Sequence, residues 1–457
     1  MVSEKDEGED KLKEKASKIS ILEGSAYAVS DGFGFRNITP YALALGASNS
    51  VIGILSSVPS LLGNLFQLVS SRLIGGYSRK KIVLFAVFLQ ALMWLFMLVP
   101  GFLYFYYNIH SSALLVIVYT SLVVFGAFGG PAWSSWMRDI IPKKIGRYFA
   151  KRNKIAGSIS LVFMLLSGFI LDYFKQTNIF IAFIILFGFS FLFRSISGLL
   201  FVKQYEPKFN VSKKKYFTFS QFFKKMPFNN FGKFTMFISL LTLAVSIASP
   251  FFSVYMLKEL GFSYSVFMIV NFADFLVILL SIKFWGKFAD SYGNIKVLRI
   301  AGFFTTLIPL LWVFTLFFRS NFYFLVFYLI SINALSGFVW SGFNLASGNF
   351  VFNAVTRDRH ALCVSYFNVL NGFGVFVGAL LGGLLASLNI GFWIFSGLVV
   401  VFIISFIARI SIYLMFVFKI REVVEVKGFE MEDTFSSFNF LRFFSHHFRF
   451  LKSRGAE

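Results

Sequence analysis

The segment Gly46-Ala-Ser-Asn-Ser-Val-Ile-Gly-Ile54 recurs 215 positions later as Gly261-Phe-Ser-Tyr-Ser-Val-Phe-Met-Ile269. Five of the nine residues are identical, and the alignment needs no gap. The same offset aligns two further pairs of segments, which begin at Asn153 and Asn368 and at Phe191 and Phe406. One constant offset across three segments predicts that the chain consists of two related halves in parallel orientation.

The composition is that of a membrane protein. Hydrophobic residues make up 57% of the 457 residues and charged residues 14%, and Phe occurs 67 times. A soluble domain carries about 25% charged residues, so too few polar side chains are present to cover a water-soluble surface. The same figures exclude disordered, coiled-coil, collagen and disulfide-scaffold proteins. With Cys363 as the only cysteine and four histidines, we expect no metal site and no cofactor.

The apolar residues divide into runs of the length that a helix needs to cross a membrane. We predict twelve transmembrane helices, at 19–43, 50–70, 82–106, 112–137, 154–174, 178–202, 233–257, 264–285, 296–318, 322–350, 362–387 and 390–418. Links between them are short, and the two-residue alternation of outer-membrane strands is absent. The predicted fold is therefore an all-α integral membrane protein of two pseudo-symmetric six-helix bundles.

The basic residues predict the orientation. Of the 43 Lys and Arg, 37 lie in the two tails or in alternate links between helices. Such an asymmetry places both termini in the cytoplasm. The net charge of +22 then faces anionic membrane lipids, and nucleic-acid binding is unnecessary to explain it. The charged residues 1–18 lack the apolar core of a cleavable signal, so we expect a multi-pass protein of the cell membrane.

These observations divide the chain into five parts. We expect a charged cytoplasmic amino tail, an amino-terminal bundle, a basic cytoplasmic connection, a carboxyl-terminal bundle and a cytoplasmic tail, at 1–18, 19–205, 206–232, 233–420 and 421–457. The connection and the tail stretch 438–452 interleave Phe with basic residues, a pattern typical of segments that lie on a membrane surface. Docking of a partner protein is the alternative for both.

One link carries a recognisable motif. The stretch Gly286-Lys-Phe-Ala-Asp290-Ser-Tyr-Gly293-Asn-Ile-Lys296 resembles the loop signature of the major facilitator superfamily, whose members have twelve spans in a six-plus-six repeat. Gly286 and Gly293 permit a tight turn, and Asp290 can accept hydrogen bonds from a helix amino terminus. The resemblance implies that Asp290, with Lys296 as the terminal base, latches the inner side closed by capping helix 5 of the other half. An ordinary turn with a helix cap is the alternative.

The resemblance has informative gaps. The counterpart loop at 71–81 has Gly75 where the acid of the signature stands, which implies a latch on one half only. Helix 4 lacks an intramembrane Arg and helix 5 lacks a Gly-Pro element, and both absences argue against a drug/proton antiporter. The stretch 131–142 looks like the helix 4–5 junction of uncharacterised prokaryotic members. The resemblance therefore implies the fold and alternating access, and leaves the cargo open.

Two aspartates lie near the middle of predicted spans. Asp31 is well beyond Lys18, the last charge of the amino tail, and this separation corresponds to roughly 15–20 Å along a helix. Asp274 has a similar depth in helix 8. Ionised side chains are costly in lipid and usually face a cavity or a partner. We expect Asp31 and Asp274 to bind cargo or to exchange protons, with Arg36 as their charge partner.

A static salt bridge between helices, such as Arg36 with Asp274, is the alternative for these acids. An unbroken helix places Asp31 and Arg36 about 140° apart, so we expect no direct pairing between them. Three amides inside the spans are candidates for hydrogen bonds to cargo: Asn37, Asn271 and Asn333.

Three further charges lie inside or near the spans. We expect Glu23 in a solvated position at the inner gate, because it is nearer the cytoplasmic end of helix 1. Arg194 and Arg409 are aligned by the offset of the internal repeat, and we expect their long side chains to reach the inner headgroups from outside the cavity. Both arginines are then structural.

The leading hypothesis is a secondary active transporter that moves a small solute by alternating access, with H⁺ as the coupling ion, as a monomer. A lipid or lipophilic-drug exporter of the same fold is one alternative, and a membrane receptor or scaffold that does not transport is another. An enzyme is disfavoured, because the chain has no phosphate-binding Gly-rich loop, no H-E-x-x-H and no C-x-x-C. We therefore expect no catalytic residue.

Overall fold

A computed structural model describes residues 4–74, 76–141, 145–207, 218–355, 357–388 and 396–423. In this part of the chain every regular element is a helix, apart from one isolated bridge between Ile74 and Tyr77. Several predictions concern residues outside the described ranges: the glycine at 75 in place of the acid of the loop signature, most of the basic connection and the tail stretch 438–452.

The helices follow one another with short links. The first group comprises α1 (Glu4–Phe33), η1 (Phe35–Asn37), α2 (Ile38–Ala44), α3 (Asn49–Leu73), α4 (Arg79–Phe96), α5 (Leu98–Tyr107), α6 (Ser112–Ile140), α7 (Ile145–Lys175) and α8 (Ile179–Lys203). The second comprises α9 (Phe219–Lys225), η2 (Met226–Phe228), α10 (Asn230–Val254), η3 (Tyr255–Glu259), α11 (Tyr264–Tyr292), α12 (Asn294–Val313), η4 (Phe314–Phe318), α13 (Phe322–Ala354), α14 (Arg357–Ser387), α15 (Gly397–Phe416) and η5 (Val417–Lys419).

Eleven helices in the described part of the chain are long and apolar enough to cross a membrane. They match the predicted spans after the first. The predicted span 19–43 is instead a helix broken between α1 and α2 by the short turn η1. Pro40 lacks the N–H that would bond the carbonyl of Arg36, which favours a break at this point.

The repeated segment of the sequence is the start of a helix in both halves. Gly46 and Gly261 have positive φ values of 73° and 64°, a backbone conformation that glycine adopts at little cost. Ser48 and Ser263 follow, and the side chain of each caps its helix by accepting a hydrogen bond from Val51 N or Val266 N. The repeat therefore encodes one local structure twice.

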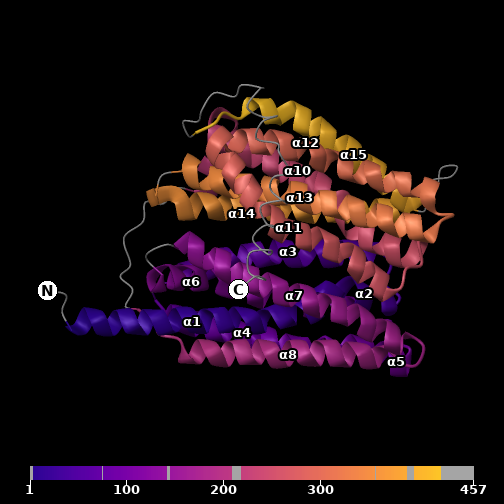
Figure 1. Ribbon diagram of the computed structural model, residues 1–457, viewed down its shortest axis with the longest axis horizontal. Coiled ribbons are helices and arrows are strands. Elements are labelled where there is room, and N and C mark those ends of the chain that lie inside the picture. The colour runs from indigo at the N-terminus through magenta and orange to yellow at the C-terminus, as the bar shows by residue number, and fades with distance from the viewer. Residues whose placement is uncertain are drawn as a thin grey trace, which may run out of the picture.

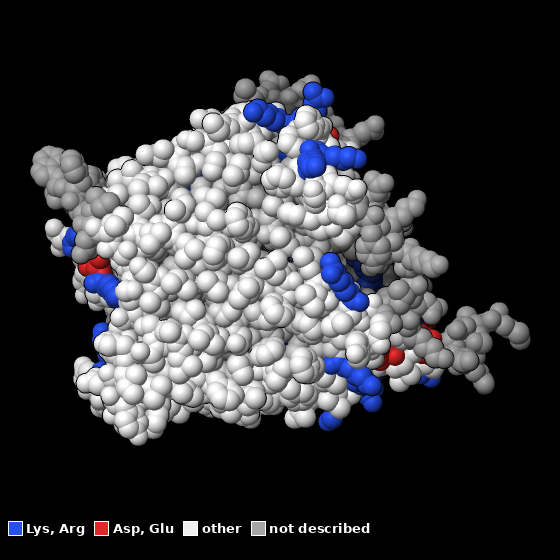
Figure 2. Space-filling view, turned by 180° about the vertical axis from the view of Figure 1, so that it is seen from behind, with Lys and Arg blue, Asp and Glu red and all other residues white. Residues whose placement is uncertain are grey.

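Helices α1–α8 and α10–α15 form two groups, which we call the amino-terminal and carboxyl-terminal groups. Each group packs mostly within itself, and the pairs α3–α14 and α7–α11 join them (Figure 1). We call the end at which α1 begins the basic end, and the end with the links at Asn108, Gly261 and Asn321 the opposite end. Figure 2 shows a broad uncharged face with Lys and Arg near its edges, as expected for a surface in contact with lipid.

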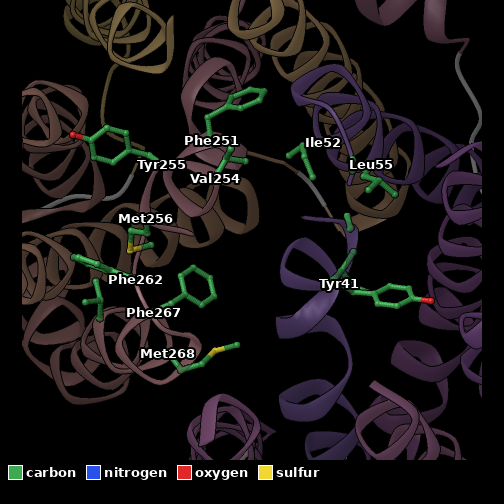
Figure 3. Packing of buried hydrophobic residues seen from close by; sticks show 14 of the residues in the cluster. Tyr41, Ile52, Leu55, Phe251, Val254, Tyr255, Met256, Phe262, Phe267 and Met268 are labelled. Carbon is green, nitrogen blue, oxygen red and sulfur yellow. The ribbon is translucent and has the colours of Figure 1, made fainter. Parts of the chain in front are cut away.

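The largest apolar core crosses from one group to the other. Tyr41, Ile52 and Leu55 come from α2 and α3, and Phe267 and Met268 come from α11, in one cluster of buried residues. Figure 3 shows these side chains in the region where the two groups approach each other. Because these helix segments lie toward the opposite end, apolar packing holds the groups together there.

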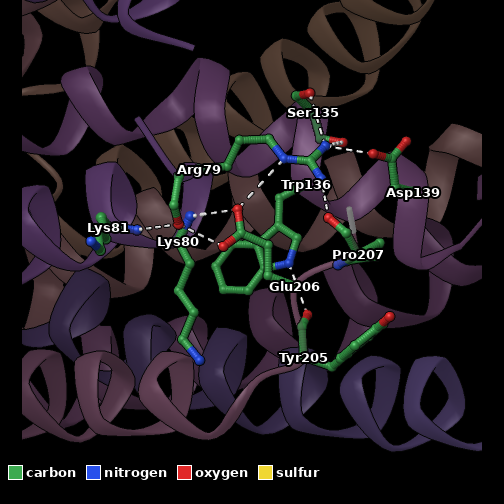
Figure 4. Close-up of polar contacts among 10 residues, drawn as sticks. Arg79, Lys80, Lys81, Ser135, Trp136, Asp139, Tyr205, Glu206 and Pro207 are labelled. Atoms are coloured by element: carbon green, nitrogen blue, oxygen red, sulfur yellow. Dashed lines mark hydrogen bonds and ion pairs between the residues drawn. The ribbon is translucent and has the colours of Figure 1, made fainter. Parts of the chain in front are cut away.

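A buried ion-pair network anchors the basic end of the amino-terminal group. Arg79 is 1% exposed and pairs with Asp139 at the end of α6 (Figure 4). Its Nη2 donates to the Pro207 carbonyl at 3.0 Å, and Glu206 Oε1 accepts from Lys80 N at 3.2 Å. In the carboxyl-terminal group, Glu422 Oε2 accepts from Ile295 N at 2.8 Å. An acid after the last helix of each group thus caps a helix of that group.

Candidate functional site

Asp31 and Arg36 form an ion pair where α1 ends. Arg36 Nη2 lies 3.2 Å from Asp31 Oδ2, and the Ser160 hydroxyl of α7 donates to the same oxygen at 2.6 Å. Our expectation that these residues do not pair was wrong. It assumed an unbroken helix, whereas α1 ends at Phe33 and the turn η1 brings Arg36 back toward Asp31.

Arg36 also faces the other group of helices. Its guanidinium carbon lies 3.8 Å from the centre of the Phe275 ring on α11, a cation–π contact between the groups. Asp274, the next residue, is close enough to Arg36 for an electrostatic interaction. Among the described residues, however, the ion pair of Arg36 is with Asp31 and not with Asp274.

Three predicted polar residues line one cavity in the carboxyl-terminal group. Asn271, Asp274 and Asn333 contribute to a cavity of about 240 Å³. Other residues of its wall are Ser249, Ser253, Ser336, Trp312, Trp340 and Arg409. The cavity combines a carboxylate, amides, hydroxyls, a guanidinium and aromatic rings, which are the groups that orient a small polar ligand.

Asn37 lies elsewhere. It is completely buried, and its Nδ2 donates to the carbonyls of Phe33 and Gly32 at 2.9 and 3.3 Å. These are carbonyls at the end of α1, which have no partner within the helix. The structure therefore gives Asn37 a part in stabilising the helix break, and it does not line the cavity with Asp274.

Glu23 is not solvated, contrary to our expectation. It is 2% exposed, and its carboxylate lies 2.9 Å from Arg152 Nη2 and 3.8 Å from Arg194 Nη1. The Ser197 hydroxyl donates to it at 2.9 Å. Position along the helix indicated its depth, but the direction in which the side chain points depends on helix rotation. A cavity of about 470 Å³ adjoins this cluster, with Trp133 in its wall.

Arg194 and Arg409 do not extend to the headgroups either. They are 7% and 1% exposed and point into their own groups of helices. Arg194 Nε donates to Gln90 Oε1 at 2.7 Å, and Arg409 Nη1 donates to the Thr305 carbonyl at 3.0 Å. Their positions on α8 and α15 were correct, and the outward orientation was wrong.

A carboxylate that the sequence analysis missed bridges the two groups. Asp172, near the end of α7, accepts hydrogen bonds from the backbone N–H groups of Tyr264 and Ser265 at 2.8 and 2.7 Å. These amides begin α11, where a negative charge is favourable. A signal was present in the sequence, because an acid in the last turn of a helix opposes the helix dipole unless it has another partner.

Further polar contacts cross between the groups at the opposite end. Lys258 Nζ donates to the Ala47 carbonyl at 3.0 Å, and Asn49 Nδ2 donates to the Ala386 carbonyl at 3.0 Å. The backbones of α3 and α14 also approach closely, because a Cβ added at Gly53 would lie 3.0 Å from Gly383 Cα. Together with Asp172, these contacts join the two groups at the opposite end.

A family model of the major facilitator superfamily matches residues 24–330 and 234–452. The chain belongs to the major facilitator superfamily. No curated protein matches it. This membership makes the chain a multi-pass membrane transporter and not an enzyme.

Solved structures of the same fold include several transporters. A point variant of the nucleoside transporter NupG has a TM-score of 0.69 at 13% identity, covering 89% of this chain and 100% of that chain. An inward-facing bacterial homologue of the iron transporter ferroportin has a TM-score of 0.64 at 13% identity, covering 88% and 98%. An inward-facing, unoccupied bacterial homologue of the human lysosomal transporter Spinster has a TM-score of 0.61 at 15% identity, covering 90% and 98%. At such identities the likeness shows the fold alone.

The superfamily loop signature lies at the end of α11. Gly293 has a φ of 91° and separates α11 from α12, as the turn requires. Our expectation that Gly286 lies in the turn was wrong, since it lies inside α11. Asp290 is exposed, and no described residue forms an ion pair or hydrogen bond with it. Lys296 Nζ lies 5.7 Å from the centre of the Tyr292 ring.

Proposed function

We propose that this protein is a secondary active transporter that moves a small solute by alternating access, with H⁺ as the coupling ion. One observation carries the proposal: charged side chains meet between two groups of helices that are held together at one end. Arg36 touches Phe275 of the other group, next to Asp274, while Asp172 binds the start of α11. A charged site at the interface of two bodies that rock against each other is the basis of alternating access.

The topology belongs to the same proposal. Counting α1 with α2 as one broken span gives twelve spans in two bundles of six, at 19–205 and 233–420. The charge asymmetry supports a cytoplasmic location for the basic end and for both tails. Closure of the opposite end then corresponds to an inward-facing state in the cell membrane. Two of the similar structures are inward-facing.

Proton coupling is assigned to Asp31 and Asp274. Asp31 is bound by Arg36 and by Ser160 of α7, at the point where α1 ends. Asp274 lies in the wall of the cavity, which Ser336 also lines. Opening and closing of the site change this environment and can therefore drive uptake and release of a proton.

The test uses purified protein in liposomes. A thermal-shift screen first identifies solutes that stabilise the protein, beginning with nucleosides and iron, which the names of two similar proteins mention. Flux of a stabilising solute is then measured with and without a pH gradient, for Asp31→Asn, Asp274→Asn and the exposed control Asp10→Asn. We expect coupling to be lost in at least one of the first two variants and kept in the control. Coupling that survives in both would remove the assignment.

A further inference from the structure

The related arginines of the two halves have different partners. Arg194 on α8 and Arg409 on α15 are aligned by the offset of the internal repeat, and both are buried. Arg194 lies 3.8 Å from the Glu23 carboxylate, which also pairs with Arg152. In the amino-terminal group, the buried guanidinium therefore has an acid within reach.

Arg409 has no acidic partner among the residues that the structure describes. Its Nε donates to the Ser405 hydroxyl at 3.1 Å, its Nη1 to the Thr305 carbonyl at 3.0 Å and its Nη2 to the Val245 carbonyl at 3.2 Å. All three acceptors are neutral. Within the described ranges, no carboxylate forms an ion pair with Arg409.

The sequence explains the difference. The offset of the repeat aligns Glu23 with Ile238, which is 6% exposed and belongs to an apolar cluster. The carboxyl-terminal half thus has the related arginine, Arg409, but an apolar residue, Ile238, at the position of Glu23. A buried charge without a counter-ion is costly, so a site of this kind favours any anion that can reach it.

Arg409 lines the cavity of about 240 Å³. The same cavity is lined by the hydroxyl residues Ser249 and Ser253 and by the amide residues Asn271 and Asn333. These groups can donate hydrogen bonds to an oxyanion or a halide. The volume limits the ligand to a small one.

Asp274 shares this cavity with Arg409. The groups that face Asp274 are Arg36 from the α1–α2 break, Ser336 from α13 and Asn271 one turn away on its own helix. Asp31 neutralises Arg36 through their ion pair. Arg409 and ionised Asp274 therefore leave the cavity without net charge, and protonation of Asp274 leaves it with one positive charge.

We propose that this cavity binds a small monovalent anion against Arg409 and binds it more tightly when Asp274 is protonated. The inference rests on the proposed function only in its use of Asp274 as a proton site. Binding of the anion and binding of the proton then favour each other reciprocally. The anion is either an inorganic ion such as chloride or the carboxylate of the cargo, and both share the same recognition chemistry.

The experiment measures the thermal stability of the full-length protein in detergent. Sodium chloride and sodium acetate are titrated separately at constant ionic strength, with sodium lactobionate as the balancing salt, since this disaccharide carboxylate is too large for the cavity. We expect saturable stabilisation by at least one anion, with about tenfold tighter apparent affinity at about pH 5 than at about pH 8. Stabilisation by chloride alone identifies a co-ion, and stabilisation by acetate points to a carboxylate cargo.

Variants identify the site. Val245→Glu adds a carboxylate to the cavity wall at the residue whose carbonyl accepts a hydrogen bond from Arg409, and Val245→Gln is its neutral control. We expect the apparent affinity for the anion to fall by about tenfold or more in V245E and to persist in V245Q. In D274N the stabilisation should persist and become independent of pH. Because Arg409→Gln removes three hydrogen bonds and can impair folding, V245E is the principal test.

The proposal is overturned if no anion stabilises the protein saturably, or if the stabilisation is unchanged in both V245E and R409Q. Stabilisation that is lost in V245E but shows the same pH dependence in D274N would overturn the link to Asp274. These outcomes are separate from proton-coupled flux in liposomes, which can fail or persist whatever the detergent-solubilised protein binds.

Discussion

The two ends of the antiparallel pair α7 and α11 carry similar residues in different states. At the opposite end, the Asp172 carboxylate of α7 accepts hydrogen bonds from the first amides of α11 at 2.8 and 2.7 Å. At the basic end, Asp290 lies in the last turns of α11, is exposed and has no partner among the described residues. Each acid sits near the carboxyl end of its helix, where it gains from binding the amino end of the other helix.

This difference explains how the loop signature of the superfamily can be present in the sequence although Asp290 has no partner among the described residues. When two rigid groups rock, closing one end of a helix pair separates the other end. We propose that the latch predicted at Asp290 forms in a conformation with the basic end closed, whereas Asp172 stabilises the conformation described here. The offset of the repeat aligns Asp290 with Gly75 and Asp172 with Ser387, so neither acid has an equivalent on the related pair α3 and α14.

Removal of the Asp172 carboxylate should have the largest effect. Asp172→Ala deletes two hydrogen bonds to a charged acceptor, each worth about 1.5–3 kcal/mol, and should open the opposite end at least about 100-fold more often. Maleimide labelling of Ala47→Cys in detergent measures this opening, because Ala47 is 1% exposed. The native Cys363 is first replaced by Ser. Asp172→Asn, which can still accept a hydrogen bond, should give an intermediate rate, and equal rates in all three proteins would contradict the role of Asp172.

A methyl group at Gly53 should have the next largest effect. Its Cβ would lie 2.7 Å from the Ala379 carbonyl and 3.0 Å from Gly383 Cα, and both are backbone atoms that cannot yield unless α3 and α14 separate. Overpacking of this kind costs about 1–3 kcal/mol, so labelling of Ala47→Cys should rise about tenfold in Gly53→Ala. Gly188→Ala is the matched control, since nothing lies within 4 Å of its added Cβ. The same increase in both variants would argue against a specific contact.

Loss of the Lys258 ammonium should have a smaller effect. Lys258→Met removes the hydrogen bond to the Ala47 carbonyl at 3.0 Å, and we expect a cost of about 1 kcal/mol and a few-fold rise in labelling. Ala386→Cys, at a position that is 2% exposed, is the reporter here, because it does not take part in the contact. Lys258→Arg should preserve the slow rate, and a rate as fast as that of K258M would show that the hydrogen bond is unimportant.

Substitution of Asp290 should have the smallest effect. Asp290→Asn alone should lower labelling of Ala47→Cys by about twofold, because it destabilises the alternative conformation in which the latch at Asp290 would form and leaves unchanged the described conformation, in which Asp290 is exposed. Combined with Asp172→Ala, the same substitution should reduce labelling by the same factor, since distant sites act additively. Identical rates for D172A with and without the Asp290 substitution would remove Asp290 from the comparison.

Spans were predictable because hydrophobic length is a property of the sequence. The predicted span 112–137 became α6, Ser112–Ile140, and 264–285 became the first part of α11. The break in the first helix was missed, although Gly34 and Pro40 stand on either side of it. That break changes which side chains meet, and it is the reason that Asp31 pairs with Arg36.

The candidate site was predictable only in part. Asn271, Asp274 and Asn333 line one cavity, as expected for polar residues at a similar depth. Asn37 instead donates a hydrogen bond to the backbone carbonyl of Phe33. Orientation caused the errors at Glu23, Arg194 and Arg409, since the sequence gives the depth of a residue in a helix and not the direction in which the helix face points. Asp172 was missed because its partners are backbone amides of a helix 92 residues away in the sequence, and its unfavourable place near the end of α7 was the one signal of them.

The amino-acid sequence alone determined that this chain crosses a membrane many times, that its two halves are related and that its basic residues gather on alternate links. These properties follow from hydrophobicity, charge and internal similarity, which are summed along the chain. Only the tertiary structure decided which end of the molecule is closed and which buried arginine has a counter-ion. Both depend on contacts between helices far apart in the sequence, and such contacts are fixed by helix rotation and packing.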